Sequence, residues 1–426
     1  MYKIPVITKI KSLPKYINFV YNGLRKTSPV QLTLFVTSRC NIRCKMCFYW
    51  EPVENKSTHE ITVEEVEKIS KSMPNLFWLL IGGGEVFVRK DLPEIIKIFY
   101  INNNVRHVSI PTNATYPDKI IDCIEKILTE CPGIFLNLNL SLNGIGKTHD
   151  SLCQKEGVFE DFLETYKKVS VLKKKYKNLG LGLNVTHSKF SEKHLDEIID
   201  YTSNNLKEID NISMGLVRGS PKDDTALSVN IEKYKESIQK IESLVVQRKL
   251  PGFKTLFGKI AFVKDMIMRR IIANTVKSGY QIPCLAGKTS LVVDERTNVY
   301  PCELLGSVGN LRNENYDMMK ILNSQKLKDS VTKIQCSNCF CTHECTYSTN
   351  ILFNKSLLIT IFKTYLVFLT KSFLRAEHIF RSFDDLHYNK KNEKIHYSGQ
   401  KGNLYEGRTF GTLKEKEKNN KPTVPF

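Results

Sequence analysis

The sequence has no aspartate or glutamate among its first 50 residues, and the whole chain carries 63 Lys and Arg against 44 Asp and Glu, a net charge of +19. A surface so short of acidic groups attracts anionic partners such as acidic lipid head groups, phosphorylated substrates or nucleic acid. Nucleic acid is the weakest of these, because no recognised RNA-binding module is present. Alternatively, the excess of Lys and Arg forms a basic surface that contacts only solvent and binds no partner.

The sequence also lacks an apolar stretch that could cross a bilayer without a charge at its middle. Its most apolar segment, residues 351–374, contains Lys355, Lys363 and Lys371, and a charge near the centre of a span is costly. A helix here would place Thr360 and Thr364 with the lysines, opposite an apolar face of Leu357, Leu358, Ile361, Phe362, Tyr365, Phe368 and Leu369. This pattern predicts a helix that lies in a membrane interface or one that docks onto the rest of the protein.

The N-terminus lacks the apolar core and small-residue cleavage site of a secretory signal, and no internal repeat is present. We therefore expect a cytoplasmic protein, with peripheral contact to the inner membrane face as an extension of that location. In a reducing compartment, densely spaced cysteines indicate metal binding rather than disulfides. The chain has 12 cysteines, and most of them fall into two groups.

The first group is Cys40, Cys44 and Cys47, in the run T-S-R-C-N-I-R-C-K-M-C-F-Y-W. Three thiolates are one fewer than a closed structural zinc site needs, whereas a cubane iron–sulfur cluster held by three cysteines leaves one iron open. An open iron can bind a small molecule and act on it, so the triplet favours an enzyme. The alternative is a zinc loop completed from elsewhere, for example by His107.

Short apolar runs alternate with helical stretches through the first half of the chain. The runs predict strands over 32–36, 76–81, 105–110, 135–142, 181–185 and 212–217, and helices over 63–72, 92–100, 119–129, 159–173 and 192–203. This alternation predicts an α/β fold with a parallel sheet, whose ligands bind at the carboxyl ends of the strands.

Together these features resemble the radical S-adenosylmethionine (SAM) enzymes, in which Phe48 would be the aromatic residue after the third cysteine of the cluster loop. The resemblance implies a partial (β/α)6 TIM-like barrel and a [4Fe–4S] cluster on Cys40, Cys44 and Cys47. It also implies that SAM binds the open iron and is reductively cleaved to a 5′-deoxyadenosyl radical, which abstracts hydrogen from a substrate.

The same resemblance assigns the SAM site at the strand ends. Gly83, Gly84 and Glu85 match the G-G-E motif that meets the SAM amino group, and Asn113 and Ser141 match positions close to SAM, the serine at its ribose. Three positions depart from the family pattern: Val86 replaces proline, Ala114 replaces glycine, and Cys153 replaces an arginine that helps to hold SAM.

The second group of cysteines comprises Cys284, Cys302, Cys336, Cys339, Cys341 and Cys345. With a hairpin predicted from 291–293 and 298–300, this region resembles the SPASM and twitch extensions of radical SAM enzymes, in which auxiliary [4Fe–4S] clusters bind. A full SPASM run is longer and has a further cysteine, and relatives usually have glycine where Thr297 stands. We therefore expect one auxiliary cluster, on Cys284, Cys302 and two of the last four cysteines. His343 could replace a missing thiolate, and a structural zinc knuckle is the alternative.

These features divide the chain into six expected parts: a basic amphipathic segment (1–29), the radical SAM barrel (30–225), a helical connector (226–280), the auxiliary-cluster domain (281–350), amphipathic apolar helices (351–387) and a disordered tail (388–426).

The short segment before the first strand leaves no room for a peptide-binding domain, which favours a small-molecule, glycan or lipid-linked substrate over a ribosomal peptide. A flavodoxin or ferredoxin is the expected electron donor. The competing hypothesis, in which the protein is not an enzyme, is a non-catalytic metal-binding scaffold at a membrane or nucleic acid.

Overall fold

The protein is described here from a computed structural model that covers residues 21, 23–26, 28–55, 59–250 and 256–369. Most of the expected basic segment at 1–29, residues 370–387 of the expected amphipathic helices at 351–387, and the whole expected tail at 388–426 lie outside the described residues.

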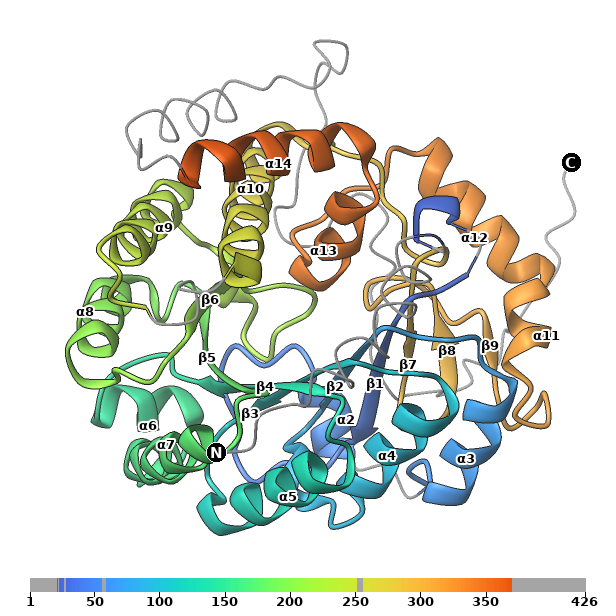
Figure 1. The fold of residues 1–426 in the computed structure, drawn as a ribbon, viewed down its shortest axis with the longest axis horizontal. Coiled ribbons are helices and arrows are strands. Elements are labelled where there is room, and N and C mark those ends of the chain that lie inside the picture. The colour runs from blue at the N-terminus through green and yellow to red at the C-terminus, as the bar shows by residue number, and fades with distance from the viewer. Residues whose placement is uncertain (1–20, 22, 27, 56–58, 251–255, 370–426) are drawn as a thin grey trace, which may run out of the picture.

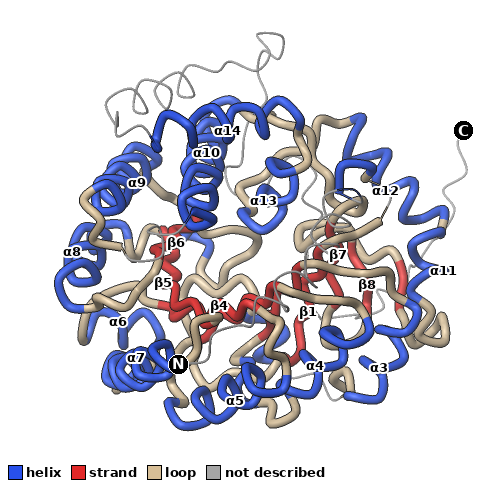
Figure 2. Tube along the Cα trace, viewed as in Figure 1, coloured by secondary structure: helices blue, strands red, loops and turns tan. Residues whose placement is uncertain are grey.

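One curved sheet of nine strands forms the centre of the molecule, in the order β6-β5-β4-β3-β2-β1-β7-β8-β9. The strands are β1 (Gln31–Thr37), β2 (Trp78–Gly83), β3 (His107–Thr112), β4 (Phe135–Ser141), β5 (Leu179–His187), β6 (Asn211–Leu216), β7 (Ser290–Val293), β8 (Asn298–Tyr300) and β9 (Gly309–Asn310). Strands β1 to β6 are parallel to their neighbours, and the sheet does not close (Figure 2). The expected partial α/β barrel is therefore confirmed.

Helices cover the convex side of this sheet and cross its open side (Figure 1). They are α2 (Trp50–Asn55), α3 (Val63–Ser72), α4 (Leu92–Asn102), α5 (Pro117–Glu130), α6 (Lys147–Cys153), α7 (Val158–Lys175), α8 (Leu195–Asn205), α9 (Ile231–Val246), α10 (Leu256–Ser278), α11 (Met318–Asn323), α12 (Gln325–Cys336), α13 (Glu344–Leu352) and α14 (Lys355–Leu369). Short 3-10 turns lie at Val86–Val88, Glu192–His194 and Asp224–Leu227. Helices α3, α4, α5 and α7 lie on the convex side, whereas α10, α13 and α14 lie across the opening.

The burial patterns explain why these segments form these elements. All seven residues of β1 are buried, as expected for a central parallel strand that is covered on both faces. Helix α5 buries Ile120, Ile124, Ile127 and Leu128, which share one face at helical spacing and meet the core.

The C-terminal hairpin continues the barrel sheet instead of forming a separate one. Strand β7 pairs in parallel with β1, and β8 pairs antiparallel with β7. The turn between them places Thr297, the position of the usual glycine, at φ +67°. The Asp294 carboxylate stabilises this turn by accepting hydrogen bonds from the backbone N–H groups of Arg296 (2.9 Å) and Asn298 (2.8 Å).

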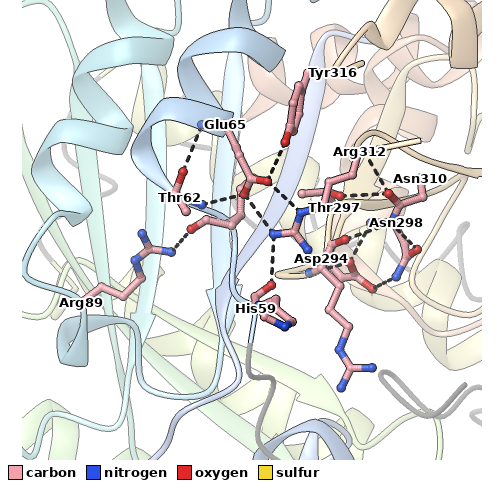
Figure 3. A network of polar contacts seen from close by, with 12 residues as sticks. His59, Thr62, Glu65, Arg89, Asp294, Thr297, Asn298, Asn310, Arg312 and Tyr316 are labelled. Carbon is pink, nitrogen blue, oxygen red and sulfur yellow. Dashed lines mark hydrogen bonds and ion pairs between the residues drawn. The ribbon is translucent and has the colours of Figure 1, made fainter. Parts of the chain in front are cut away.

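A polar network joins the barrel to the chain that follows β9 (Figure 3). Glu65 forms a capping box with Thr62 at the start of α3, and its carboxylate also accepts hydrogen bonds from Arg312 at 2.7 and 3.0 Å. The hydroxyl of Tyr316 donates a third hydrogen bond to Glu65, at 3.0 Å. The Arg312 hydrogen bond lowers the pKa of Glu65 to about 2, so the carboxylate stays ionised and keeps the two regions joined.

Helix α14 docks against α10 and α13, as one of the two alternatives predicted. The predicted division of its faces is wrong at two positions, because Phe362 is 61% exposed while Thr364 is buried. The physical reason is that α14 packs against two helices at once, so its buried stripe is rotated towards Ile361, Thr364 and Tyr365. Within the described part of the chain, no helix combines the length and apolarity that crossing a membrane requires.

Candidate functional site

The three cysteines of the first group lie together in the loop that follows β1. Cys40 and Cys47 pack in one apolar cluster with Phe35 and Tyr49, and Cys40 and Cys44 pack in a second beside Cys153. Burial is the main cause that raises the pKa of Cys40 to about 11, and burial together with the nearby Cys44 raises the pKa of Cys47. Three half-buried thiols that resist ionisation alone are a donor set suited to a positively charged metal centre.

Backbone contacts from two distant segments fix this loop. Near the end of α6, the carbonyls of Leu152 and Cys153 accept hydrogen bonds from the backbone N–H groups of Lys45 and Arg43, both at 3.1 Å. From the segment after β6, the Lys222 N–H donates to the Cys47 carbonyl, also at 3.1 Å. The loop that carries the cysteines is thus positioned by hydrogen bonds that do not involve the thiols.

Cys153 stands where relatives have an arginine, and it lies against the cysteine loop. A hydrogen bond with the Cys153 thiol is the largest of the causes that raise the pKa of Cys44, followed by burial. The Cys153 sulfur also lies 3.8 Å from Nε2 of His149. A buried thiol replaces the expected arginine, so this position offers no cation to a SAM carboxylate.

Gly83 and Gly84 allow the end of β2 to pass close to the cysteine loop. A Cβ on Gly83, whose φ is +131°, would lie 2.3 Å from the Thr37 carbonyl oxygen, and a Cβ on Gly84 would lie 2.2 Å from that of Arg39. The backbone N–H groups of Gly84 and Glu85 donate hydrogen bonds to these two carbonyls, both at 2.8 Å. Glycine is required here by the contact between the two backbones.

The Glu85 carboxylate is buried and turned into the fold. One oxygen accepts hydrogen bonds from the Thr112 hydroxyl (2.9 Å) and the Phe87 N–H (3.2 Å), and the other accepts from the Asn113 N–H (2.8 Å). Burial raises the pKa of Glu85 to about 7, although these hydrogen bonds oppose the shift. Glu85 therefore ties the end of β2 to the end of β3.

Asn113 lies beside the cysteine loop. Its side-chain amide donates a hydrogen bond to Asn41 at 2.9 Å and lies 3.9 Å from the Cys40 sulfur. Ser141 ends β4 and pairs in register with Asn184 of β5. The geometry brings Glu85 and Asn113 next to the cysteines, and places Ser141 at the end of β4, the strand beside β3, on the same carboxyl edge.

Phe48 is linked to the C-terminal region by a residue that the sequence analysis did not select. The guanidinium of Arg218 lies 4.7 Å from the centroid of the Phe48 ring, and it donates hydrogen bonds to Glu303 at 3.0 and 3.3 Å. Arg218 follows β6 at the edge where parallel sheets bind ligands, and this position was the signal that could have identified it.

Tyr49 makes a second link between the two regions. Its hydroxyl donates a hydrogen bond to the Glu295 carboxylate in the hairpin turn. Burial and the neighbouring Asp294 raise the pKa of Glu295 to about 7, and burial is also the main cause that raises the pKa of Tyr49. Phe48 and Tyr49, the two residues after Cys47, are therefore both linked to the C-terminal region.

Four of the six C-terminal cysteines come together. Cys284, Cys302, Cys339 and Cys341 pack in one cluster with Ala286, Leu304, Leu305 and Ile334. The thiols of Cys284 and Cys339 share a hydrogen bond, and Cys302 and Cys341 lie close enough to Cys339 to raise its pKa further. The other two diverge, since Cys336 is exposed and Cys345 lies beside His343 and Glu303.

Both donor sets fit iron–sulfur clusters: three thiols leave one iron open, and four thiols close a cubane. The alternative zinc site with His107 is not assembled, because that residue opens β3 at the amino end of the sheet. There its ring lies 4.8 Å from that of Phe77 and 5.7 Å from that of Phe135, centroid to centroid.

Comparisons with known proteins agree with this geometry. Residues 34–202 match the model of the Radical SAM superfamily. The antilisterial bacteriocin subtilosin biosynthesis protein AlbA of Bacillus subtilis is 25% identical over 304 residues, which cover 68% of this chain and 59% of AlbA. The cysteine-type anaerobic sulfatase-maturating enzyme of Clostridium novyi is 24% identical over 330 residues, 71% of this chain and 83% of that enzyme. The chain thus spans about three-fifths of AlbA and most of the second relative.

Solved structures show the same fold. The structure of anSMEcpe with bound AdoMet covers 83% of this chain and 99% of its own, with a TM-score of 0.53 and 16% identity. Streptococcus suis SuiB covers 84% of this chain and 82% of its own, with a TM-score of 0.51 and 14% identity. With its open parallel sheet, its cysteine loop after β1 and its cysteine-rich C-terminal region, the chain is similar to the Radical SAM superfamily, whose model matches its residues 34–202.

Proposed function

We propose that this protein is an enzyme that reductively cleaves SAM and uses the product to abstract hydrogen from a substrate. The observation that carries the proposal is the assembly of Cys40, Cys44 and Cys47 at the carboxyl end of β1, beside Asn113 from the end of β3. A [4Fe–4S] cluster with SAM on its open iron supplies a 5′-deoxyadenosyl radical when one electron is delivered. The chain's own residues would hold and orient these groups.

In this proposal Cys40, Cys44 and Cys47 hold three irons of the cluster. Gly83 and Gly84 let the end of β2 support the cluster loop from behind, and Glu85 fixes Asn113 beside Cys40. Phe48, Asn113 and Ser141 would line the SAM site, together with backbone groups of the G-G-E segment. Because protein groups already occupy both oxygens of Glu85, its contribution to SAM binding would be made through a change of partner or through its backbone.

We further propose that Cys284, Cys302, Cys339 and Cys341 hold one auxiliary [4Fe–4S] cluster within residues 281–350, the region whose hairpin continues the sheet of the barrel at 30–225. Four thiols from distant parts of the sequence converge there, which supports a complete ligand set. The cluster would relay or accept an electron, or position the substrate. A flavodoxin or ferredoxin is the proposed donor of the electron that starts the reaction.

The substrate has two candidate classes. The first is a small molecule, a glycan or a lipid-linked compound. Two relatives matched over more than two thirds of this chain, however, are a bacteriocin biosynthesis protein and a sulfatase-maturating enzyme. The matches to a GTP 3′,8-cyclase and a pterin dimethyltransferase cover only 33% and 21% of it. The longer matches favour a peptide or protein substrate as the second candidate.

Peripheral contact with an anionic membrane is proposed for the exposed side of α14. Ile359, Phe362 and Leu366 are 57%, 61% and 45% exposed, and Lys355 and Lys363 on the same helix are exposed too. A helix with apolar and basic side chains on one face binds acidic interfaces. In a flotation assay with phosphatidylserine vesicles, the wild type should be recovered in the floating vesicle fraction. An Ile359→Ser/Phe362→Ser/Leu366→Ser variant should remain at the bottom of the gradient. Equal flotation of both proteins would exclude α14 as the contact.

The enzymatic proposal is tested under anaerobic conditions. The purified protein should contain about eight irons per chain, the content of two [4Fe–4S] clusters, and should release 5′-deoxyadenosine from SAM after addition of dithionite. Stimulation of this release by peptides encoded beside the gene would favour the peptide class over small molecules. Zinc in place of iron, with no SAM cleavage by a fully metal-loaded sample, would leave the non-catalytic scaffold as the function.

A further inference from the structure

Three side chains that neither cluster needs lie together beside the auxiliary cysteines. A carboxylate oxygen of Glu303, a ring nitrogen of His343 and the sulfur of Cys345 lie within 4.8 Å of one another. Glu303 and His343 are 4% and 2% exposed, and Cys345 is half-buried. Glu303 follows the second strand of the hairpin, whereas His343 and Cys345 flank the start of α13.

Each of the two buried ligands is oriented by another residue. Arg218 donates hydrogen bonds to Oε2 of Glu303, while the other oxygen, Oε1, lies 3.2 Å from Nε2 of His343. On the opposite side of the ring, Nδ1 of His343 lies 3.1 Å from the Thr346 hydroxyl. Metal-binding histidines and carboxylates are commonly held in this way by a partner on the atom that does not bind the metal.

The His343 nitrogen that faces Glu303 lies within ion-pair distance of the carboxylate, at 3.2 Å, but the two do not meet hydrogen-bond geometry. Among the described residues, Nε2 is a buried atom with no hydrogen bond, because its geometry with Oε1 does not make one. A buried polar atom without a hydrogen bond is costly, and a bound metal ion is one way to satisfy it. The atom points towards a carboxylate and lies near a thiol, which is a ready set of metal ligands.

We propose that Glu303, His343 and Cys345 bind one divalent metal ion of the zinc class, at a site separate from both iron–sulfur clusters. Thiolate, imidazole and carboxylate are the three ligand types that Zn²⁺ accepts, and three protein ligands leave a fourth tetrahedral position open. Water or a heteroatom of a bound molecule would fill that position. The site does not depend on SAM cleavage, so either proposal can fail while the other stands.

The neighbouring groups place this site between the two cysteine centres. Arg218 contacts Glu303 through hydrogen bonds and the Phe48 ring through its cation, so one side chain connects the proposed zinc site to the cluster loop. Cys345 is absent from the group in which Cys284, Cys302, Cys339 and Cys341 pack. The competing assignment, in which Cys345 or His343 completes an iron–sulfur cluster, predicts a different response of the iron content.

The experiment compares wild type with Cys345→Ala, His343→Ala and Glu303→Gln, and uses Cys336→Ala as the matched control on an exposed cysteine of the same segment. Cluster-loaded protein is incubated anaerobically with Zn²⁺, passed over a desalting column and analysed for zinc and iron. We expect about one zinc per wild-type and Cys336→Ala chain, and at least tenfold weaker zinc binding by the other variants with iron unchanged. Circular dichroism melting curves identify any variant that fails to fold. If the Ala variants fail to fold, the conservative Glu303→Gln variant still reports on zinc binding.

X-ray absorption at the zinc edge then identifies the ligands. One sulfur at about 2.3 Å with nitrogen or oxygen ligands at about 2.0 to 2.2 Å would support the site. Four sulfur ligands would place the zinc among the auxiliary cysteines and overturn the proposal. Loss of about four irons in Cys345→Ala would also overturn it, since a cubane cluster would then use that cysteine. Unchanged zinc binding in the three variants, or a wild-type protein that retains no zinc, would overturn the proposal as well.

Discussion

The two cysteine regions reach similar chemistry by opposite routes. Cys40, Cys44 and Cys47 lie within eight residues of one loop, and backbone hydrogen bonds hold that loop without help from the thiols. The four auxiliary cysteines are spread from position 284 to position 341, and packing of separate segments brings them together. The first site is local and identifiable from spacing, whereas the second exists only in the folded protein.

The largest effect should come from removing the local site. A Cys40→Ala/Cys44→Ala/Cys47→Ala variant should lose all SAM cleavage and about four of its eight irons, because its cluster has no other ligands. Anaerobic iron analysis and 5′-deoxyadenosine assays measure both losses. Retention of about four irons in the auxiliary site would show that the two sites assemble independently, and loss of all iron would show that they do not.

A pair of variants distinguishes the C-terminal cysteines that would bind the auxiliary cluster from one that would not. Cys339→Ala should lose about four irons, since Cys339 packs among the other three thiols. Cys336→Ala, only three residues away and exposed, should keep them all. The reverse result would mean that the chain between the two cysteines rearranges when the cluster binds.

The local site can also be disturbed without touching a thiol. In Gly84→Ala the new Cβ would lie 2.2 Å from the Arg39 carbonyl oxygen and 3.1 Å from the Cys40 Cβ, so the cluster loop must move. We expect destabilisation of about 3 kcal/mol and a large loss of SAM cleavage. Gly82→Ala is the control, because its Cβ would meet only the Phe35 ring at 3.4 Å. Thermal melts and cleavage assays of the two variants should differ clearly, and equal behaviour would contradict the close-packing argument.

The smallest effect concerns the network that joins the two regions. Glu65→Gln should lower the free energy of unfolding by about 2 kcal/mol at pH 7, because Arg312 loses its charged partner. The folded-state pKa of Glu65, about 2, lies below its ordinary value of 4.5, so ionised Glu65 stabilises the fold above about pH 4.5. That advantage over the Gln variant should shrink as the pH falls from 4.5 towards 2. Urea unfolding across this range tests it, and a difference independent of pH would exclude the charge as its source.

The sequence predicted the barrel well because its information is local. The apolar runs at 32–36 and 135–142 and the helix at 63–72 coincide with β1, β4 and α3 to within one residue at each end. The motif residues fell at the carboxyl ends of their strands, as parallel topology requires. The hairpin at 291–293 and 298–300 was equally predictable from its two short β-branched runs and turn.

Long-range pairing could not be predicted in the same way. Nothing near Arg218 or Glu303 indicates that they meet across 85 positions of the chain. The carboxylate of Glu85 was expected to face SAM, yet its hydrogen bonds to Thr112 and Asn113 depend on the register of β2 against β3. Likewise, periodicity showed that α14 is amphipathic but not that two helices would bury Thr364 and leave Phe362 exposed.

The pairing of β7 with β1 has a consequence for biosynthesis. Residues 31–34 pair with residues 290–293, so β1 keeps an unpaired edge until nearly 300 residues have left the ribosome. An exposed strand edge beside reactive thiols is prone to aggregation. A protein shortened to the barrel segment would retain that edge permanently. In the proposed enzyme, loading of the first cysteine site with iron and sulfide would therefore depend on the last strands of the sheet to be synthesised.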